Sequence, residues 1–105
     1  MKLMTAEIKK QFAKQAALGI TGDNAIVYLK LFDPCGRFTA YAIEYEPEHN
    51  ECFGYVISPL GQDCDEWGYF SLTEIAAVRN RLGLGIERDR WWKPKRIGDV
   101  IRSDD

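Results

Sequence analysis

Four residues carry side chains that could bind a metal ion or act as a nucleophile: Cys35, His49, Cys52 and Cys64. Structural zinc sites usually pair their ligands two to four residues apart at both ends. Only His49 and Cys52 stand close together in the chain, and the other two cysteines are isolated. A nucleophilic cysteine needs a base, and the single histidine lies in an acidic predicted loop. We therefore predict no metal site, no cofactor and no catalytic set, although an enzyme of unknown reaction stays open as a further alternative.

Paired carboxylates are the next group that could do chemistry. Asp63, Asp65 and Glu66 crowd one predicted loop, and Glu44 and Glu46 share one face of a predicted strand. Such pairs act as general acid and base when a cleft desolvates one carboxyl and separates the two pKa values. The sequence indicates no cleft. We interpret Asp63, Asp65 and Glu66 as acidic candidates for binding a partner rather than for catalysis.

A basic segment that contains two tryptophans runs from Glu87 to Arg96, with the sequence ERDRWWKPKR. Its cations could bind phosphates while an indole ring stacks on an unpaired base. The candidate residues for binding nucleic acid or a partner are Arg88, Arg90, Trp91, Trp92, Lys93, Lys95 and Arg96. Two acids interrupt the run, and the isoelectric point of the chain is near 5.4. A basic footprint over the whole domain is therefore missing.

The charges are unevenly distributed although the net charge is only -2. Residues 44–66 contain seven acids and no lysine or arginine, whereas residues 79–102 contain eight basic residues and three acids. A bipolar surface could dock a protein partner or a second copy of the chain. The alternative is that both regions are solvated faces that neutralise one another across the fold. The sequence leaves open whether the two regions face one another.

The chain has 105 residues, of which 46% are hydrophobic, so we predict a single domain over residues 1–105 with residues 103–105 frayed. No run reaches the length of a membrane span, and the first residues lack the apolar core of a signal peptide. An odd number of widely spaced cysteines is typical of reduced thiols. These patterns predict a cytoplasmic protein that has no membrane partner.

The elements that must position these residues are those of an α+β fold. Thr5 can cap an amphipathic helix that stops near Gly19. Four strands are predicted to follow, at residues 26–32, 38–46, 52–58 and 67–72. Alternation in the second strand predicts one face made of Thr39, Tyr41, Ile43 and Tyr45, and an opposite face that includes Glu44 and Glu46. The strands should form a four-stranded antiparallel meander, with the two helices at its ends packed on one face.

The second of these helices follows the fourth strand. Ser71 and Glu74 form a capping box that predicts its start. Ile75, Val78 and Leu82 recur at helical spacing, so that the helix should run for about three turns and end at Gly83. The tail from residue 97 is expected to begin as a short helix.

One long run resembles a known family: GYFSLTEIAAVRNRLGLGIERDRWWKP, preceded by KLF at residues 30–32 and FG at residues 53–54. It is similar to a bacterial domain of unknown function (DUF2958), met in genomes and on mobile elements. The string LGLGIERD at residues 82–89 is its most specific part. The chain departs from the family pattern at Asn80 and Arg81, where a Gly-Pro pair is common, and at Gly85, where a proline is common. The resemblance implies a single small domain and no reaction.

From these patterns we predict a small non-catalytic intracellular interaction or accessory module, belonging to a phage or other mobile element and acting on a host or self partner. The alternative is a nucleic-acid-binding protein that uses residues 87–96. A protein partner or self-association is the preferred kind of partner.

Overall fold

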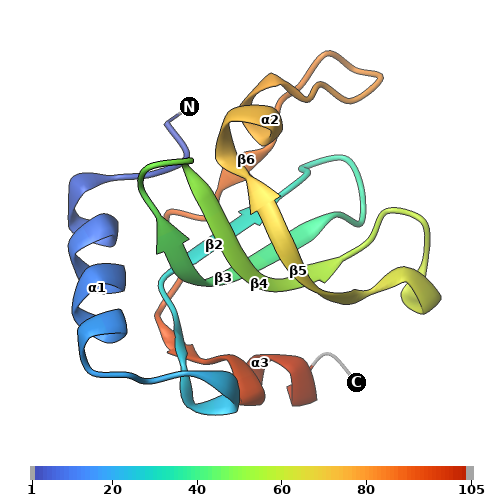
Figure 1. The fold of residues 1–105 in the computed structure, drawn as a ribbon. Coiled ribbons are helices and arrows are strands. Elements are labelled where there is room, and N and C mark those ends of the chain that lie inside the picture. The colour runs from blue at the N-terminus through green and yellow to red at the C-terminus, as the bar shows by residue number, and fades with distance from the viewer. Residues whose placement is uncertain (1, 104–105) are drawn as a thin grey trace.

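The computed structural model describes residues 2–103 and has an α+β fold (Figure 1). Its helices are α1 (Ala6–Ala17), α2 (Leu72–Ala77) and α3 (Ile97–Ser103), with two short 3-10 turns, η1 (Gly22–Asn24) and η2 (Gln62–Cys64). Its strands are β1 (Ile26–Val27), β2 (Leu29–Phe32), β3 (Thr39–Glu46), β4 (Glu51–Ile57), β5 (Glu66–Ser71), β6 (Glu87–Arg88) and β7 (Lys95–Arg96).

Helix α1 begins and ends where the sequence predicts. The hydroxyl of Thr5 accepts a hydrogen bond from the amide of Ile8 at 3.1 Å, and this satisfies one of the free amides of the first turn. Gly19 follows the helix with a φ of 69°, a conformation that favours glycine. Phe12 and Gln15 form the buried side of the helix.

The main sheet has five antiparallel strands in the order β5-β4-β3-β2-β6. The predicted four-stranded meander is present, but β6 adds a fifth strand by pairing Glu87 and Arg88 with the outer edge of β2. The predicted strand at residues 26–32 divides at Tyr28, and β1 pairs with β7 in a separate two-stranded sheet. Both added strands are two residues long, which is too short to produce a periodic pattern in the sequence.

Strand β3 contains a bulge that changes its predicted faces. Ala42 lies opposite Gly54 in β4, whereas Phe53 lies opposite Glu44, so that Ile43 is the extra residue. Beyond such a residue the alternation of the strand is reversed. The predicted face was therefore wrong at its end: Tyr45 packs with the core beneath α1, while Glu44 lies opposite Phe53.

The side chain of Gln15 holds the bulge to helix α1. Its amide group donates to the carbonyl oxygens of Ile43 at 3.0 Å and Ile26 at 3.1 Å, and its oxygen accepts from the amide of Ile26 at 2.8 Å. Gln15 is only 4% exposed. A buried polar side chain with all of these partners fixes α1 relative to β1 and β3.

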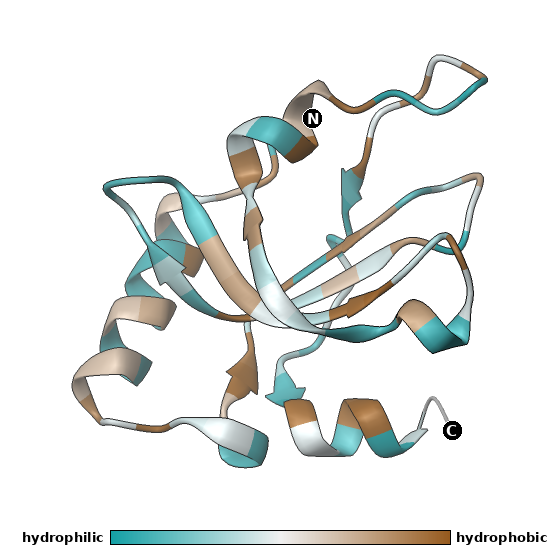
Figure 2. Ribbon diagram, turned by 45° about the vertical axis from the view of Figure 1, so that its right-hand side comes forward, coloured by the Kyte–Doolittle hydropathy of each residue, from teal (hydrophilic) through white to brown (hydrophobic). Residues whose placement is uncertain are grey.

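The sheet separates two hydrophobic clusters. The first contains Phe12 of α1, Leu72 and Ile75 of α2, and one face of the central strands, so that both predicted helices pack on the same side. The second contains Tyr41 and Ile43 of β3 together with residues of α3. Figure 2 shows α3 below the sheet, with hydrophobic residues recurring along its length. The tail is thus a helix, as predicted, and it covers the second face.

Helix α2 is shorter than predicted. It starts at the predicted cap, where the hydroxyl of Ser71 accepts from the amide of Glu74 at 3.2 Å, but it ends at Ala77. Val78 is extended, and Leu82 is 69% exposed instead of packing on the sheet. The side chain of Asn80 accepts hydrogen bonds from the amides of Leu82 and Leu84. These local hydrogen bonds replace helical ones in residues 78–85. Gly83 lies in a turn of this loop, with a positive φ of 79°.

Two further predictions concern the C-terminal end of the chain and membrane-spanning helices. Ser103, which was predicted to fray, is the last residue of α3, and residues 104–105 lie outside the described residues. Within residues 2–103, no helix has the length and apolar character needed to cross a membrane.

Candidate functional site

The basic segment, Glu87–Arg96, forms strand β6, a turn and strand β7. Asp89 shapes the turn, because its carboxylate accepts from the amide of Trp91 at 3.0 Å and pairs with the ammonium group of Lys30 at 3.5 Å. The amide of Asp89 donates to the carbonyl of Lys30 at 2.9 Å. Asp89, one of the two acids that interrupt the basic run, therefore anchors this turn to β2.

The two tryptophans of the basic segment have different environments. The indole N–H of Trp92 donates to the carbonyl of Val27 at 2.8 Å, and its ring centroid lies 5.7 Å from that of Tyr41 in the second cluster. The ammonium groups of Lys30 and Lys95 lie 5.3 and 4.9 Å from the centre of the Trp92 ring. Trp91 is 87% exposed. Trp92 is thus part of the core, and only Trp91 presents its ring to solvent.

The cations of the segment are also divided. Arg88 donates to the carbonyl of Lys2 at 2.8 Å, and Arg96 binds the carboxylate of Asp99 and the side chain of Asn24. The hydrogen bond from Arg96, followed by that from Arg102, holds the pKa of Asp99 below its usual value. Among the five predicted cations, Arg88 is half-buried, and Arg96 is exposed but paired with Asp99. Arg90 and Lys93 are exposed beside Trp91.

The acidic candidates are divided in the same way. Asp63 and Glu66 are exposed. Asp65 instead accepts two hydrogen bonds of 2.7 Å from the guanidinium of Arg37 and one of 2.8 Å from the amide of Ser58. The hydrogen bond from Arg37 is the largest cause that lowers the pKa of the Asp65 carboxyl. Asp65 thus fastens the loop at residues 59–65 to the start of β3.

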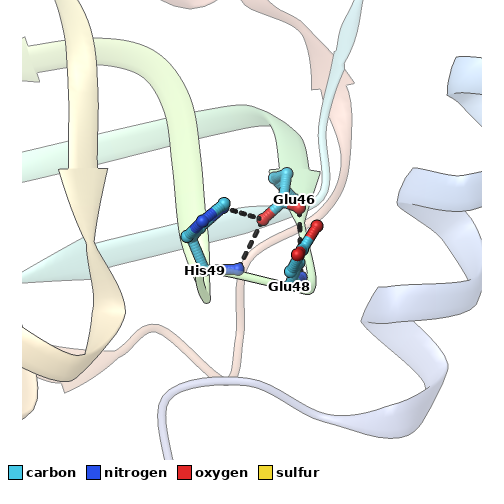
Figure 3. A group of neighbouring side chains, drawn as sticks. All are labelled: Glu46, Glu48 and His49. Atoms are coloured by element: carbon cyan, nitrogen blue, oxygen red, sulfur yellow. Dashed lines mark hydrogen bonds and ion pairs between the residues drawn. The ribbon is translucent and has the colours of Figure 1, made fainter.

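The only group of three metal-ligand side chains in the described part of the chain lies in the β3–β4 turn (Figure 3). The Glu46 carboxylate accepts from the amides of Glu48 and His49 and pairs with the His49 imidazole at 3.2 Å. All three residues are exposed, and Glu46 already serves as the acceptor that closes the turn. The cluster has the contacts of a capped hairpin turn, and it contains no cysteine.

The three cysteines differ in their exposure to solvent. Cys52 is 1% exposed, and burial followed by the charge of Glu51 raises its pKa to about 12. A thiol of this kind stays protonated and unreactive at neutral pH. Cys35 and Cys64 are exposed, and all three cysteines are free thiols.

Four aromatic side chains that sequence reasoning missed lie together on β4 and β5. These residues, which we call the aromatic face, are Phe53, Tyr55, Trp67 and Tyr69. Phe53 is opposite Tyr69 and Tyr55 is opposite Trp67 in the ladder. The ring centroids of Phe53 and Tyr69 are 4.8 Å apart, those of Tyr55 and Trp67 are 5.6 Å apart, and Phe53 stacks on Trp67 at 6.0 Å. The four rings form one continuous layer.

The aromatic face is open to solvent at the edge of the sheet. Tyr69 is 71% exposed and Trp67 is 38% exposed. Both belong to β5, one of the two edge strands of the main sheet. An edge strand presents a row of backbone donors and acceptors to whatever approaches it. The signal that could have predicted this face is the aromatic-glycine-aromatic run, which occurs at residues 53–55 and again at residues 67–69.

Comparison with known proteins gives one match. Residues 3–99 match the model of the family described as protein of unknown function (DUF2958), which confirms the resemblance drawn from the sequence. No match was found among curated proteins or among solved structures.

Proposed function

This chain belongs to the DUF2958 family of proteins of unknown function, and since that description names no activity, we propose from its surface that it is a small non-catalytic interaction module. Its partner is a protein segment that docks on the aromatic face beside strand β5. The observation that carries the proposal is the exposure of Trp67 and Tyr69 on an edge strand. Tryptophan and tyrosine are enriched among the few residues that supply most of the binding energy at protein interfaces.

The geometry favours an extended partner segment. A chain that pairs with the outer edge of β5 gains backbone hydrogen bonds, and its alternate side chains then contact the exposed rings. The aromatic rings are packed against one another before binding, so that little side-chain entropy is lost when a partner docks. The module acts inside the cell, where its free cysteines stay reduced, and serves a phage or other mobile element by binding a host protein or another copy of itself.

The test compares two exposed aromatic residues on different surfaces. Tyr69→Ser removes a ring of the aromatic face, and Trp91→Ser, the matched control, removes a more exposed ring from the basic segment. We expect a defined protein to be captured from host lysate by the wild type and by Trp91→Ser, and to be lost with Tyr69→Ser. Sedimentation velocity of the same three proteins detects self-association. Equal behaviour of both variants in both assays would refute docking on the aromatic face.

The basic segment supports a second candidate function, which is binding of single-stranded nucleic acid. One observation favours it: Trp91 is 87% exposed and lies between the exposed cations Arg90 and Lys93. A stacking ring between cations is the arrangement that binds single strands. This function predicts that Trp91→Ser weakens binding of a short single strand, that binding falls steeply with salt, and that Tyr69→Ser has no effect. Binding that is indifferent to salt would contradict it.

A further inference from the structure

A pocket of about 330 Å³ adjoins the aromatic face, between the second half of α1 and strands β3, β4 and β5. Its walls are mostly apolar and include the rings of Tyr45, Phe53 and Tyr69. This volume is at the lower end of the range for ligand sites, and it accommodates one long side chain. Because Tyr69 belongs to both the pocket and the edge strand, a segment paired with β5 passes beside the opening.

Three carboxylates stand around this pocket: Glu44, Glu46 and Glu51. Among the described residues that line it, there is no lysine or arginine. The bulge in β3 is the reason that the acids gather there, since it places Glu44 opposite Phe53 and Glu46 opposite Glu51. If β3 kept all of its residues but paired with β4 without a bulge, strict alternation would turn both acids toward the core beneath α1. We call this site the acidic pocket.

The charges of the acidic pocket are poorly neutralised within the molecule. Glu46 and Glu51 are directly opposite in the ladder, and like charges in that position destabilise a sheet. Of the ion pairs formed within residues 2–103, one involves these acids, between Glu46 and His49 (Figure 3). The nearby ammonium group of Lys9 lies over the ring of Tyr45, at 5.9 Å from its centre. A bound cation would relieve the repulsion between the paired acids.

We propose that the acidic pocket binds the lysine or arginine side chain of the partner segment that docks on β5. The aliphatic stem of such a side chain lies against the apolar wall, and its charged head reaches the carboxylates. The rings of Phe53 and Tyr69 attract the same cation through their π faces. An anionic or neutral side chain gains neither interaction. This inference rests on the proposed docking function and adds the chemical class of the residue that the partner must supply.

The test uses capped peptides of β-branched residues with one central arginine, and matched peptides in which citrulline or glutamate replaces it. Citrulline keeps the shape of arginine and removes its charge. Binding to the full chain is followed by NMR chemical shifts of the residues lining the acidic pocket. We expect the arginine peptide to bind at least about tenfold more tightly than the citrulline peptide, a preference that salt weakens, and the glutamate peptide to bind least.

Two variants connect this preference to the pocket. The double variant Glu44→Gln and Glu51→Gln is expected to abolish the preference for arginine over citrulline. Glu66→Gln is the matched control, because Glu66 is exposed on β5 but alternates with Trp67 and so points to the opposite face of the sheet. An unchanged preference in the double variant, or an equal loss in the control, would overturn the proposal. So would the absence of binding by the arginine peptide.

The outcomes also separate this inference from the docking function on which it rests. If arginine and citrulline peptides bind equally and Tyr69→Ser weakens both, the aromatic face docks a partner and the acidic pocket has no charge selectivity. If a lysate partner is lost with Tyr69→Ser but retained by the double variant, the same conclusion holds. If Tyr69→Ser changes neither measurement, the docking function itself fails.

Discussion

Gly54 provides the sharpest test of the bulged sheet. A Cβ atom added at Gly54 would lie 1.8 Å from the carbonyl oxygen of Tyr41 and 2.9 Å from the Cα of Ala42. Both contacts are with backbone, so a rotamer change cannot relieve them, and β3 must move by about 1.5 Å to restore ordinary contact. We expect Gly54→Ala to destabilise the fold by about 3 kcal/mol or more, since overpacking against a rigid neighbour lies at the upper end of its range.

The matched control lies directly across the ladder. Gly68 pairs with Gly54, and a Cβ atom at Gly68 would meet nothing within 4 Å. Gly68→Ala should therefore be neutral or stabilise by about 0.5 kcal/mol, because alanine restricts the unfolded chain. Thermal unfolding followed by circular dichroism should show a Tm lower by roughly 12–24 °C for Gly54→Ala and nearly unchanged for Gly68→Ala. Equal Tm values for the two variants would refute the close approach of β3 and β4 at the bulge.

Three further predictions test other parts of the structure. Thiol titration of the native protein should label two cysteines rapidly and leave Cys52, which is buried, unlabelled until denaturant is added; rapid labelling of all three would contradict its burial. The pKa of Asp65 is lowered in the fold, chiefly by the hydrogen bond from Arg37. This contact therefore stabilises the fold above the pKa of the unfolded carboxyl, near 3.8, and the stabilisation is lost as the pH falls below that value. The urea midpoint of Asp65→Asn should depend less on pH in this acid range than that of the wild type. Gln15→Leu leaves three backbone groups without a partner and should cost about 3 kcal/mol in urea unfolding, whereas Gln11→Leu, one turn earlier and half-buried, should cost well under 1 kcal/mol.

Much of the fold could be predicted from the sequence because local patterns specify it. The signals for the cap at Thr5, the strand at residues 52–58 and the cap at Ser71 each act within a few residues, and all three elements are confirmed. The short strands β6 and β7 could not be predicted, because pairing with distant residues forms them. The predicted end of α2 was wrong. The hydrogen bonds from the amides of Leu82 and Leu84 to the Asn80 side chain compete with the hydrogen bonds of a longer helix.

The candidate surfaces were harder to predict, because residues that are neighbours in the sequence have different contacts in the fold. Trp92 donates to the backbone of β1, and Arg96, although exposed, pairs with Asp99. The acidic pocket depends on the bulge in β3, which reverses the alternation after Ile43. A strict alternation of period two assigns Glu44 to the wrong face, and no residue type in the strand marks the bulge.

The bulge also determines where a change of length would leave the faces of the strands unchanged. Ladder pairing is already in register on both sides of Ile43, with Ala42 opposite Gly54 and Glu44 opposite Phe53. Deleting Ile43 therefore keeps each remaining side chain on its present face, whereas deleting a residue from β4 shifts one half of that strand against both of its neighbours. When related chains are aligned, a one-residue gap belongs at Ile43, and a gap placed elsewhere in β3 would misassign the residues of the binding surface.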